Sequence, residues 1–197
     1  PGFEINDAGI LQTADDIDTW GEIAYRENTP GDLFHNYQVE LSASNGWNFG
    51  LVRQFTNIGI ALAATWKNFY ISEVEIDYGS GALNDHQTRG GPLMKSGAGW
   101  SFYGSLSNSY SDDLRWNAWS TLFSDALGSS SWSAGGLLSL RTRGWLEFSV
   151  EPSYTRSINT RQYVMTTENG PSETFGRRYV FASIDQGKRR VLSPSFK

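Results

Sequence analysis

The fold is decided by residues 99–155, GWSFYGSLSNSYSDDLRWNAWSTLFSDALGSSSWSAGGLLSLRTRGWLEFSVEPSYT. At its start the even positions carry Trp100, Phe102 and Leu106, whereas the odd positions are mostly serine. The same alternation recurs in residues 114–122, 131–142 and 146–154. Because side chains on a strand point alternately to opposite faces of a sheet, the stretch predicts four antiparallel strands with one apolar and one polar face.

The same periodicity predicts strands on both sides of this stretch. Four are expected before it, at about residues 17–26, 34–44, 57–66 and 69–78, and an extended segment that includes residues 178–181 follows it. The dipeptide Asn45-Gly46 is predicted to form a hairpin turn, and a connection prolonged by residues 47–55 is the alternative.

The predicted connections differ in length at the two ends of the sheet. Short ones, at 67–68, 111–113 and 143–144, alternate with longer ones at 79–96 and 125–130. We therefore expect one all-β domain over residues 1–197, with a lead-in (1–16), a long loop (79–96) and a basic tail (187–197).

Composition excludes several classes of protein. The net charge of the 197 residues is −5 and the one basic cluster is Lys188-Arg189-Arg190, so no nucleic-acid partner is expected. The chain has no cysteine, which excludes a disulfide scaffold and thiolate metal sites. No apolar run approaches the roughly 18–20 residues of a transmembrane helix, and no signal peptide is visible. A start without Met suggests a mature form or a fragment.

The apolar face of the predicted sheet must be covered either by lipid or by other protein. An outer-membrane barrel is favoured by strands of about 10–13 residues, a polar face rich in Ser and Asn, and Trp66, Trp100 and Trp132 near strand ends, where an interface belt would lie. A soluble β-sandwich or barrel is the alternative, since amphipathic antiparallel sheets are common in soluble proteins and the mean hydropathy is only −0.43.

Three sequence segments carry a family resemblance. They are Phe3-Glu-Ile-Asn-Asp-Ala-Gly-Ile-Leu-Gln12, Arg89-Gly-Gly-Pro92 and Arg178-Tyr-Val-Phe-Ala-Ser-Ile-Asp-Gln186, in this order. With them the chain, over about residues 3–186, resembles the C-terminal barrel region of the domain-of-unknown-function 5916 family. The resemblance implies a bacterial outer-membrane protein whose N-terminal domain is similar to family 9 carbohydrate-binding modules.

The chain departs from the family pattern in two places. The region of the N-terminal module is absent, so we expect a piece of a larger protein. The family pattern continues with further strands after Gln186, whereas here Gly187 to Arg190 leads into a short tail. The expected fold is therefore an all-β antiparallel meander of about 9–10 strands, forming a whole or partial outer-membrane-type β-barrel, with two exposed edges if partial.

The candidate site residues are charged side chains on the predicted polar face. Lumen lining is the main interpretation and ligand contact is an alternative. Catalysis by paired acids is a weaker alternative, which the spacing permits because i and i+2 positions on a strand lie about 6.5–7 Å apart. Bases such as Arg53, Arg115 and Arg141 are expected to balance the acids. The residues concerned are Glu73, Glu75, Asp77, Arg115, Arg141, Glu147 and Glu151.

Other catalytic signals are weak. The two histidines, His35 and His86, cannot make a metal site without further ligands, and no G-x-S-x-G segment is present. The glycine-rich residues 79–82 lack the context of a phosphate-binding loop, and the glycines of Arg89-Gly-Gly-Pro92 are expected to adopt a special backbone conformation. No enzyme activity, metal or cofactor is predicted.

The sequence therefore predicts a membrane anchor or a pore or transport component of a larger protein, with the lipid bilayer of the bacterial outer membrane as its partner. The alternative from another class is a soluble carbohydrate-binding β-sheet protein with an oligosaccharide ligand. A membrane-associated hydrolase with acids in the lumen is a third, weaker alternative.

Overall fold

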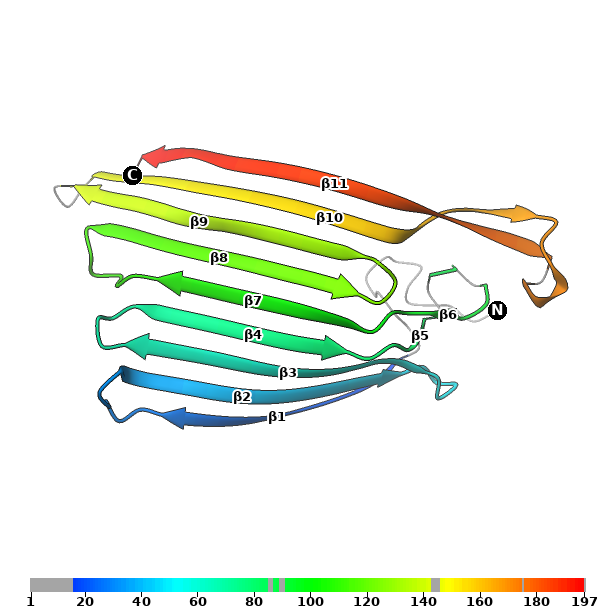
Figure 1. Cartoon of the computed structure of the whole chain (residues 1–197), viewed down its shortest axis with the longest axis horizontal. Coiled ribbons are helices and arrows are strands. Elements are labelled where there is room, and N and C mark those ends of the chain that lie inside the picture. The colour runs from blue at the N-terminus through cyan, green and yellow to red at the C-terminus, as the bar shows by residue number, and fades with distance from the viewer. Residues whose placement is uncertain (1–15, 85–86, 89–90, 143–145, 175, 197) are drawn as a thin grey trace, which may run out of the picture.

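A computed structural model describes residues 16–84, 87–88, 91–142, 146–174 and 176–196. Nine strands form one antiparallel sheet in which every strand pairs with its neighbour in sequence, so the predicted meander is confirmed (Figure 1). The strands are β1 (Ile17–Glu27), β2 (Phe34–Trp47), β3 (Arg53–Trp66), β4 (Ile71–Gly79), β7 (Gly99–Ser107), β8 (Leu114–Asp125), β9 (Ser130–Thr142), β10 (Leu146–Glu168) and β11 (Arg177–Phe196).

The two remaining strands are short. β5 (Leu83–Asn84) pairs with β6 (Met94–Lys95) inside the predicted long loop, where Ser96 N–H also donates to the carbonyl of Ala82. A single turn of 3-10 helix, η2 (Ser172–Thr174), lies between β10 and β11. No helix in the described ranges is long and apolar enough to cross a membrane.

The prediction of a turn at Asn45-Gly46 is wrong. Both residues belong to β2, and the chain reverses at residues 48–52, where Leu51 has a φ of 59°. The Asn48 side chain closes this turn by accepting a hydrogen bond of 2.9 Å from Val52 N–H. Gly46 serves a different purpose, since the ring of Phe55 lies where a Cβ on Gly46 would stand.

The prediction of a basic tail after Gln186 is also wrong. Residues 187–196 continue β11, which pairs with β10 from Gly187 opposite Arg156 to Phe196 opposite Phe148. β9 occupies one edge of β10 and leaves the other edge available, so the last residues of the chain have a strand to pair with.

The contrast between short and long connections is weaker than predicted. Residues 126–129 form a four-residue connection because β8 and β9 extend to Asp125 and Ser130, whereas 108–113 is longer than expected. The contrast rests on two connections at the same end of the sheet, residues 80–98 and 169–176, and we call this the long-loop end.

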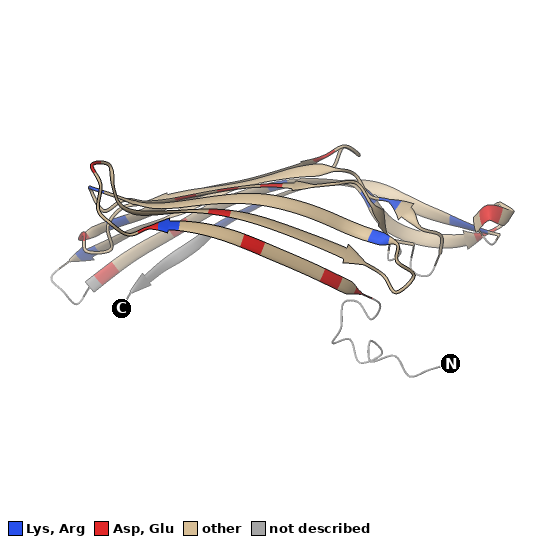
Figure 2. Ribbon diagram, turned by 90° about the horizontal axis from the view of Figure 1, so that it is seen from below, with Lys and Arg blue, Asp and Glu red and all other residues tan. Residues whose placement is uncertain are grey.

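The sheet is open rather than closed into a barrel. Within the described residues β1 and β11 each pair with one strand only. The whole sheet is a single arched layer (Figure 2). A sheet in one layer has no interior, and Ala82 is the one hydrophobic residue that is buried in the part of the chain that the structure describes.

The two faces of the layer follow the predicted alternation. Apolar-face side chains such as Ile58, Leu62 and Leu138 are 43–58% exposed. Some polar-face residues are far more enclosed: Ser139 is 1% exposed, and a Cβ on Gly59 would lie 2.7 Å from Ser42 Oγ. Around Ser139 and Gly59 the polar face is therefore more crowded than the apolar face.

Candidate functional site

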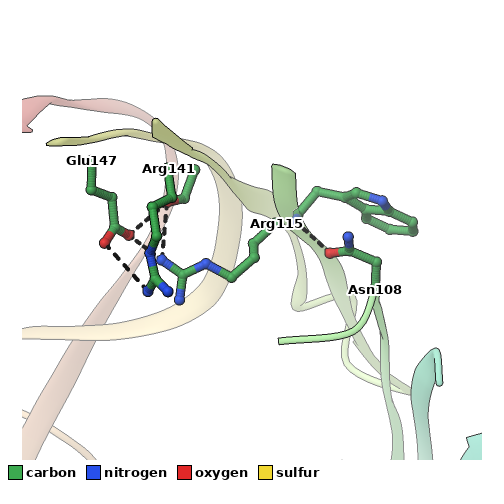
Figure 3. Close-up of polar contacts among 6 residues, drawn as sticks. Asn108, Arg115, Arg141 and Glu147 are labelled. Carbon is green, nitrogen blue, oxygen red and sulfur yellow. Dashed lines mark hydrogen bonds and ion pairs between the residues drawn. The ribbon is translucent and has the colours of Figure 1, made fainter. Parts of the chain in front are cut away.

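Three adjacent strands bring one group of predicted site residues together on the polar face. The register places Arg115 of β8 opposite Ser139 of β9, and Arg141 of β9 opposite Glu147 of β10. The Glu147 carboxylate forms an ion pair with Arg115, accepts a hydrogen bond of 2.6 Å from Ser139 Oγ, and lies 4.0 Å from Arg141 Nη2 (Figure 3).

This carboxylate is satisfied by its own protein. One of its oxygens is held by a guanidinium and a buried hydroxyl, and its side chain is 31% exposed. Such a group is suited to joining three strands, because each partner comes from a different strand or strand position. Glu147 with Arg115 and Arg141 is therefore a structural cluster on the polar face.

Asn108 makes its own hydrogen bonds in the turn before β8, next to this cluster. Its amide donates to the carbonyl of Leu114 (2.6 Å) and to Asp112 (2.8 Å), and its carbonyl accepts from Trp116 N–H (2.7 Å; Figure 3). The residue is 6% exposed. Sequence reasoning placed Asn108 inside a strand, although the capacity of Asn side chains to bond nearby backbone was a signal for a turn.

The acids of β4 form a second group that stays apart from the first. Glu73 and Asp77 accept long hydrogen bonds from Ser105 Oγ (3.4 Å) and Ser101 Oγ (3.3 Å) of β7, and Glu75 lies between them. Within the described residues none of the three forms an ion pair. β7 separates them from Arg115, so Arg115 and Arg141 pair with Glu147 and not with the acids of β4.

Arg53, the third base expected to balance the acids, also has another role. Its Nη2 donates to the carbonyl of Gly81 at 2.8 Å, which ties the start of β3 to the long connection between β4 and β7. The last predicted site residue, Glu151, lines a hollow of about 500 Å³ with Asn108, Arg115 and Arg190.

A larger hollow at the long-loop end was missed by the sequence reasoning. It has a volume of about 570 Å³, and three aromatic side chains of the polar face line it: Trp20, Phe55 and Phe123. The sequence signal was present, since each of these residues occupies a position where the alternation calls for a polar side chain.

Gly91 of one resemblance segment meets Tyr179 of another in space. The ring of Tyr179 stands where a Cβ on Gly91 would lie, so Gly91 is needed for close approach and not for a positive φ. Arg161 of the same hairpin donates to the carbonyl of Lys95 at 2.6 Å. The β10–β11 hairpin is thus packed against the connection that contains β5 and β6. Arg89 and Gly90 lie outside the described residues.

The histidines offer no metal site within the described residues. His35 stacks on Phe69 with ring centroids 4.4 Å apart, and His86 lies outside the residues that the structure describes. No cluster of three or more His, Asp or Glu side chains suited to a metal was found among the described residues.

Aromatic side chains on the apolar face gather at both ends of the strands. Near the end with turns 28–33 and 67–70, Tyr25 contacts Tyr37 (centroids 6.1 Å apart), Phe34 contacts Trp66 (4.7 Å) and Tyr70 contacts Trp116 (5.6 Å). Near the long-loop end, Tyr78 contacts Trp100 (4.6 Å) and Trp132 contacts Tyr154 (5.4 Å). Aliphatic side chains such as Leu62 and Val74 lie between the two groups.

The comparisons with curated proteins and with solved structures found no match. A family model does match, over residues 1–186, and its description is "Domain of unknown function (DUF5916)". This match includes eight strands of the nine-stranded sheet and the first part of the ninth. The chain belongs to the DUF5916 family.

Proposed function

We propose that the chain forms part of the wall of a β-barrel in the bacterial outer membrane, where it acts as the anchor or as a pore component of a larger protein. The observation that carries this proposal is an uncovered apolar face bounded by two aromatic rows on a single-layer sheet. In water this face would leave many large apolar side chains exposed, such as Ile58, Leu62 and Leu138, and burial of each is worth about 1.5–3 kcal/mol.

The spacing of the aromatic rows supports a bilayer as the covering. Tyr70 directly precedes β4 and Tyr78 lies near the end of β4, and the segment from one to the other has nine residues. A membrane strand that is tilted by about 45° needs about 9–11 residues.

The rows also move along the strands as membrane boundaries should. At the long-loop end, the register runs level from Tyr78 of β4 through Trp100, Ser124 and Ser130 to Ile158 of β10. The aromatic residue on β10 is Tyr154, four residues from Ile158, so the boundary shifts by four residues over four strand steps. At the other end, the boundary shifts in the same direction by four residues between Tyr25 of β1 and Trp66 of β3. It then stays level through Tyr70 to Trp116 of β8, so the shift is four residues over five strand steps.

This average shift of 0.8–1 residue per strand means that the aromatic boundaries are not perpendicular to the strands. With about 3.3 Å per residue and about 4.8 Å between strands, the boundaries run about 30–35° from the perpendicular to the strands. Strands of membrane barrels are tilted by about 35–45°. The two boundaries shift on different strands, one between β1 and β3 and the other between β7 and β10, but both move in the same direction across the sheet, as expected for a bilayer around tilted strands.

The test is partitioning of the expressed chain. We expect a species that needs detergent or lipid, has a strand-type circular dichroism spectrum and migrates differently on gels before and after heating. In vesicles containing brominated lipids, the tryptophan fluorescence should be quenched most by bromines near the head groups, because Trp66, Trp100 and Trp132 lie in the aromatic rows. A monodisperse, water-soluble β-protein whose fluorescence ignores the bromines would overturn the proposal.

The second candidate is a soluble carbohydrate-binding protein, and the specific observation in its favour is the aromatic hollow around Trp20. It makes the opposite prediction in the same experiment, namely a folded chain in plain buffer. It also requires a second layer over the apolar face, so the soluble species would be an oligomer with that face buried.

A further inference from the structure

Three aromatic residues of the polar face are not explained by a barrel wall. Trp20 of β1, Phe55 of β3 and Phe123 of β8 face the side on which Ser, Asn and Glu dominate. Trp20 is 76% exposed and Phe123 is 41% exposed, so neither is needed to fill a core. All three gather at the long-loop end, around the hollow of about 570 Å³, which we call the aromatic groove.

Glycines form the floor of the aromatic groove. Gly59, Gly79 and Gly99 line it on β3, β4 and β7. A Cβ on Gly99 would lie 2.9 Å from the carbonyl oxygen of Ser124, so a side chain has no room there without displacing backbone. From Trp20 to Phe123 the groove crosses six adjacent strands, which is about 24 Å at 4.8 Å per strand. Its shape suits an extended ligand.

The groove is polar but almost uncharged. Its walls offer the hydroxyls of Ser42, Ser44 and Ser101 and the amide of Asn57, and Asp77 is the one ionisable side chain in its described lining. At its rim the buried Ser80 Oγ has no hydrogen-bond partner in the described part of the chain. Hydroxyl and amide groups with exposed aromatic faces recognise a ligand that has many hydroxyls and weakly polar ring faces.

We propose that the aromatic groove binds a neutral oligosaccharide, with sugar rings stacked on Trp20 and Phe123 and hydroxyls bonded to the serines and Asn57 between them. This inference goes beyond the barrel wall, because the groove is built on the polar face and does not depend on what covers the apolar face. Phosphorylated and nucleotide ligands are disfavoured, since the described lining of the groove has no cation to pair with an anion.

The experiment is a calorimetric titration of the full chain with maltohexaose, cellohexaose and xylohexaose. The chain is refolded in lauryldimethylamine oxide, because detergents with sugar head groups would compete. We expect saturable binding of at least one of the three. Trp20→Ala and Phe123→Ala should each weaken it about tenfold, the usual scale for loss of one stacked ring, whereas Trp20→Phe should stay within threefold of the wild type.

Two controls distinguish sugar stacking in the groove from a general loss of aromatic surface and from a cation site. Trp132→Ala removes the same residue type from the apolar face and should leave affinity within twofold. Asp77→Asn is titrated with Ca²⁺, because it would abolish binding of Ca²⁺ if the groove were a cation site. Circular dichroism of each variant shows that it is folded, and Trp20 lies on an edge strand where a substitution disturbs few contacts.

Three results would overturn the inference. They are no saturable heat with any of the three sugars, a Trp132→Ala effect as large as that of Trp20→Ala, or Ca²⁺ binding that Asp77→Asn removes while no sugar binds. If the chain proves soluble, the same titration is run in buffer. Sugar binding by a chain that does not enter vesicles would refute the membrane proposal alone, and a vesicle-inserted chain without sugar binding would refute the groove alone.

Discussion

The two faces of the sheet differ in what holds them. On the apolar face, neighbours such as Ile60 and Ile76 touch across strands but nothing in the described chain lies above them. On the polar face, the chain supplies its own partners, as it does for Glu147 and Asn108. The apolar face therefore depends on what surrounds the protein, whereas the polar face is held by contacts within the chain. The effect of a substitution on stability should depend on the presence of lipid for the apolar face and not for the polar face.

The strongest test of this difference between the faces is to place a charge on each face, at adjacent positions in the sequence. Leu62→Arg puts a cation in the middle of the apolar face, and Ala63→Arg puts one on the polar face near Glu73, opposite it in the register. In lipid vesicles the first should lower the free energy of unfolding by about 2–4 kcal/mol. The second should change it by less than about 1 kcal/mol.

Urea titration of both variants in vesicles, followed by tryptophan fluorescence, measures the two values. Equal losses for Leu62→Arg and Ala63→Arg would mean that the apolar face is not covered by lipid.

The next prediction concerns the polar face, where the chain supplies its own hydrogen-bond and ion-pair partners. Glu147→Leu removes the acceptor of Arg115 and of the buried Ser139 hydroxyl, and leaves a half-buried guanidinium beside an apolar group. The free energy of unfolding should fall by about 2–3 kcal/mol, because a half-buried charged group without a partner is desolvated without compensation. Glu151→Leu is the matched control on the same strand and face, and a loss as large there would show that Glu147 has no special role.

A smaller effect is expected at the turn before β8. Asn108→Ala leaves Trp116 N–H and the carbonyl of Leu114 without their side-chain partner, and should cost about 1–2 kcal/mol. Asn117→Ala, on the neighbouring strand, tests whether loss of any amide on this face has the same effect. Hydrogen exchange at the Trp116 amide reports on the turn directly and should quicken in the first variant alone.

The smallest effect should come from the long-loop end. Gly91→Ala forces a methyl group against the Tyr179 ring, and the overpacking should cost about 1 kcal/mol, confined to the β10–β11 hairpin and the adjoining connection. Gly91→Ala combined with Tyr179→Ala should lose less than the sum of the two single changes. Additive losses would mean that Gly91 and Tyr179 do not contact each other in solution.

Much of the fold could be predicted from local patterns. Alternation in segments such as residues 114–122 and 131–142 defines strands and faces, because a one-residue slip would expose every apolar side chain on the wrong side. For the same reason, parity, which is the odd or even position of a residue along its strand, was enough to place the charged site residues on the polar face. These residues are Glu73, Glu75, Asp77, Arg115, Arg141, Glu147 and Glu151. Parity does not say which of them are neighbours, and Glu147 met its arginines only because β8, β9 and β10 are adjacent.

By itself, then, the sequence determined the strands, their order of pairing and the chemistry of each face, since these depend on residues close together in the chain. Tertiary structure alone decided three further features. Asn45-Gly46 became strand because Phe55 of the next strand packs on Gly46. Residues 187–196 became strand because β10 had a free edge. The aromatic groove exists because Trp20 and Phe123, about a hundred residues apart, lie on strands that the arch of the sheet brings around one hollow.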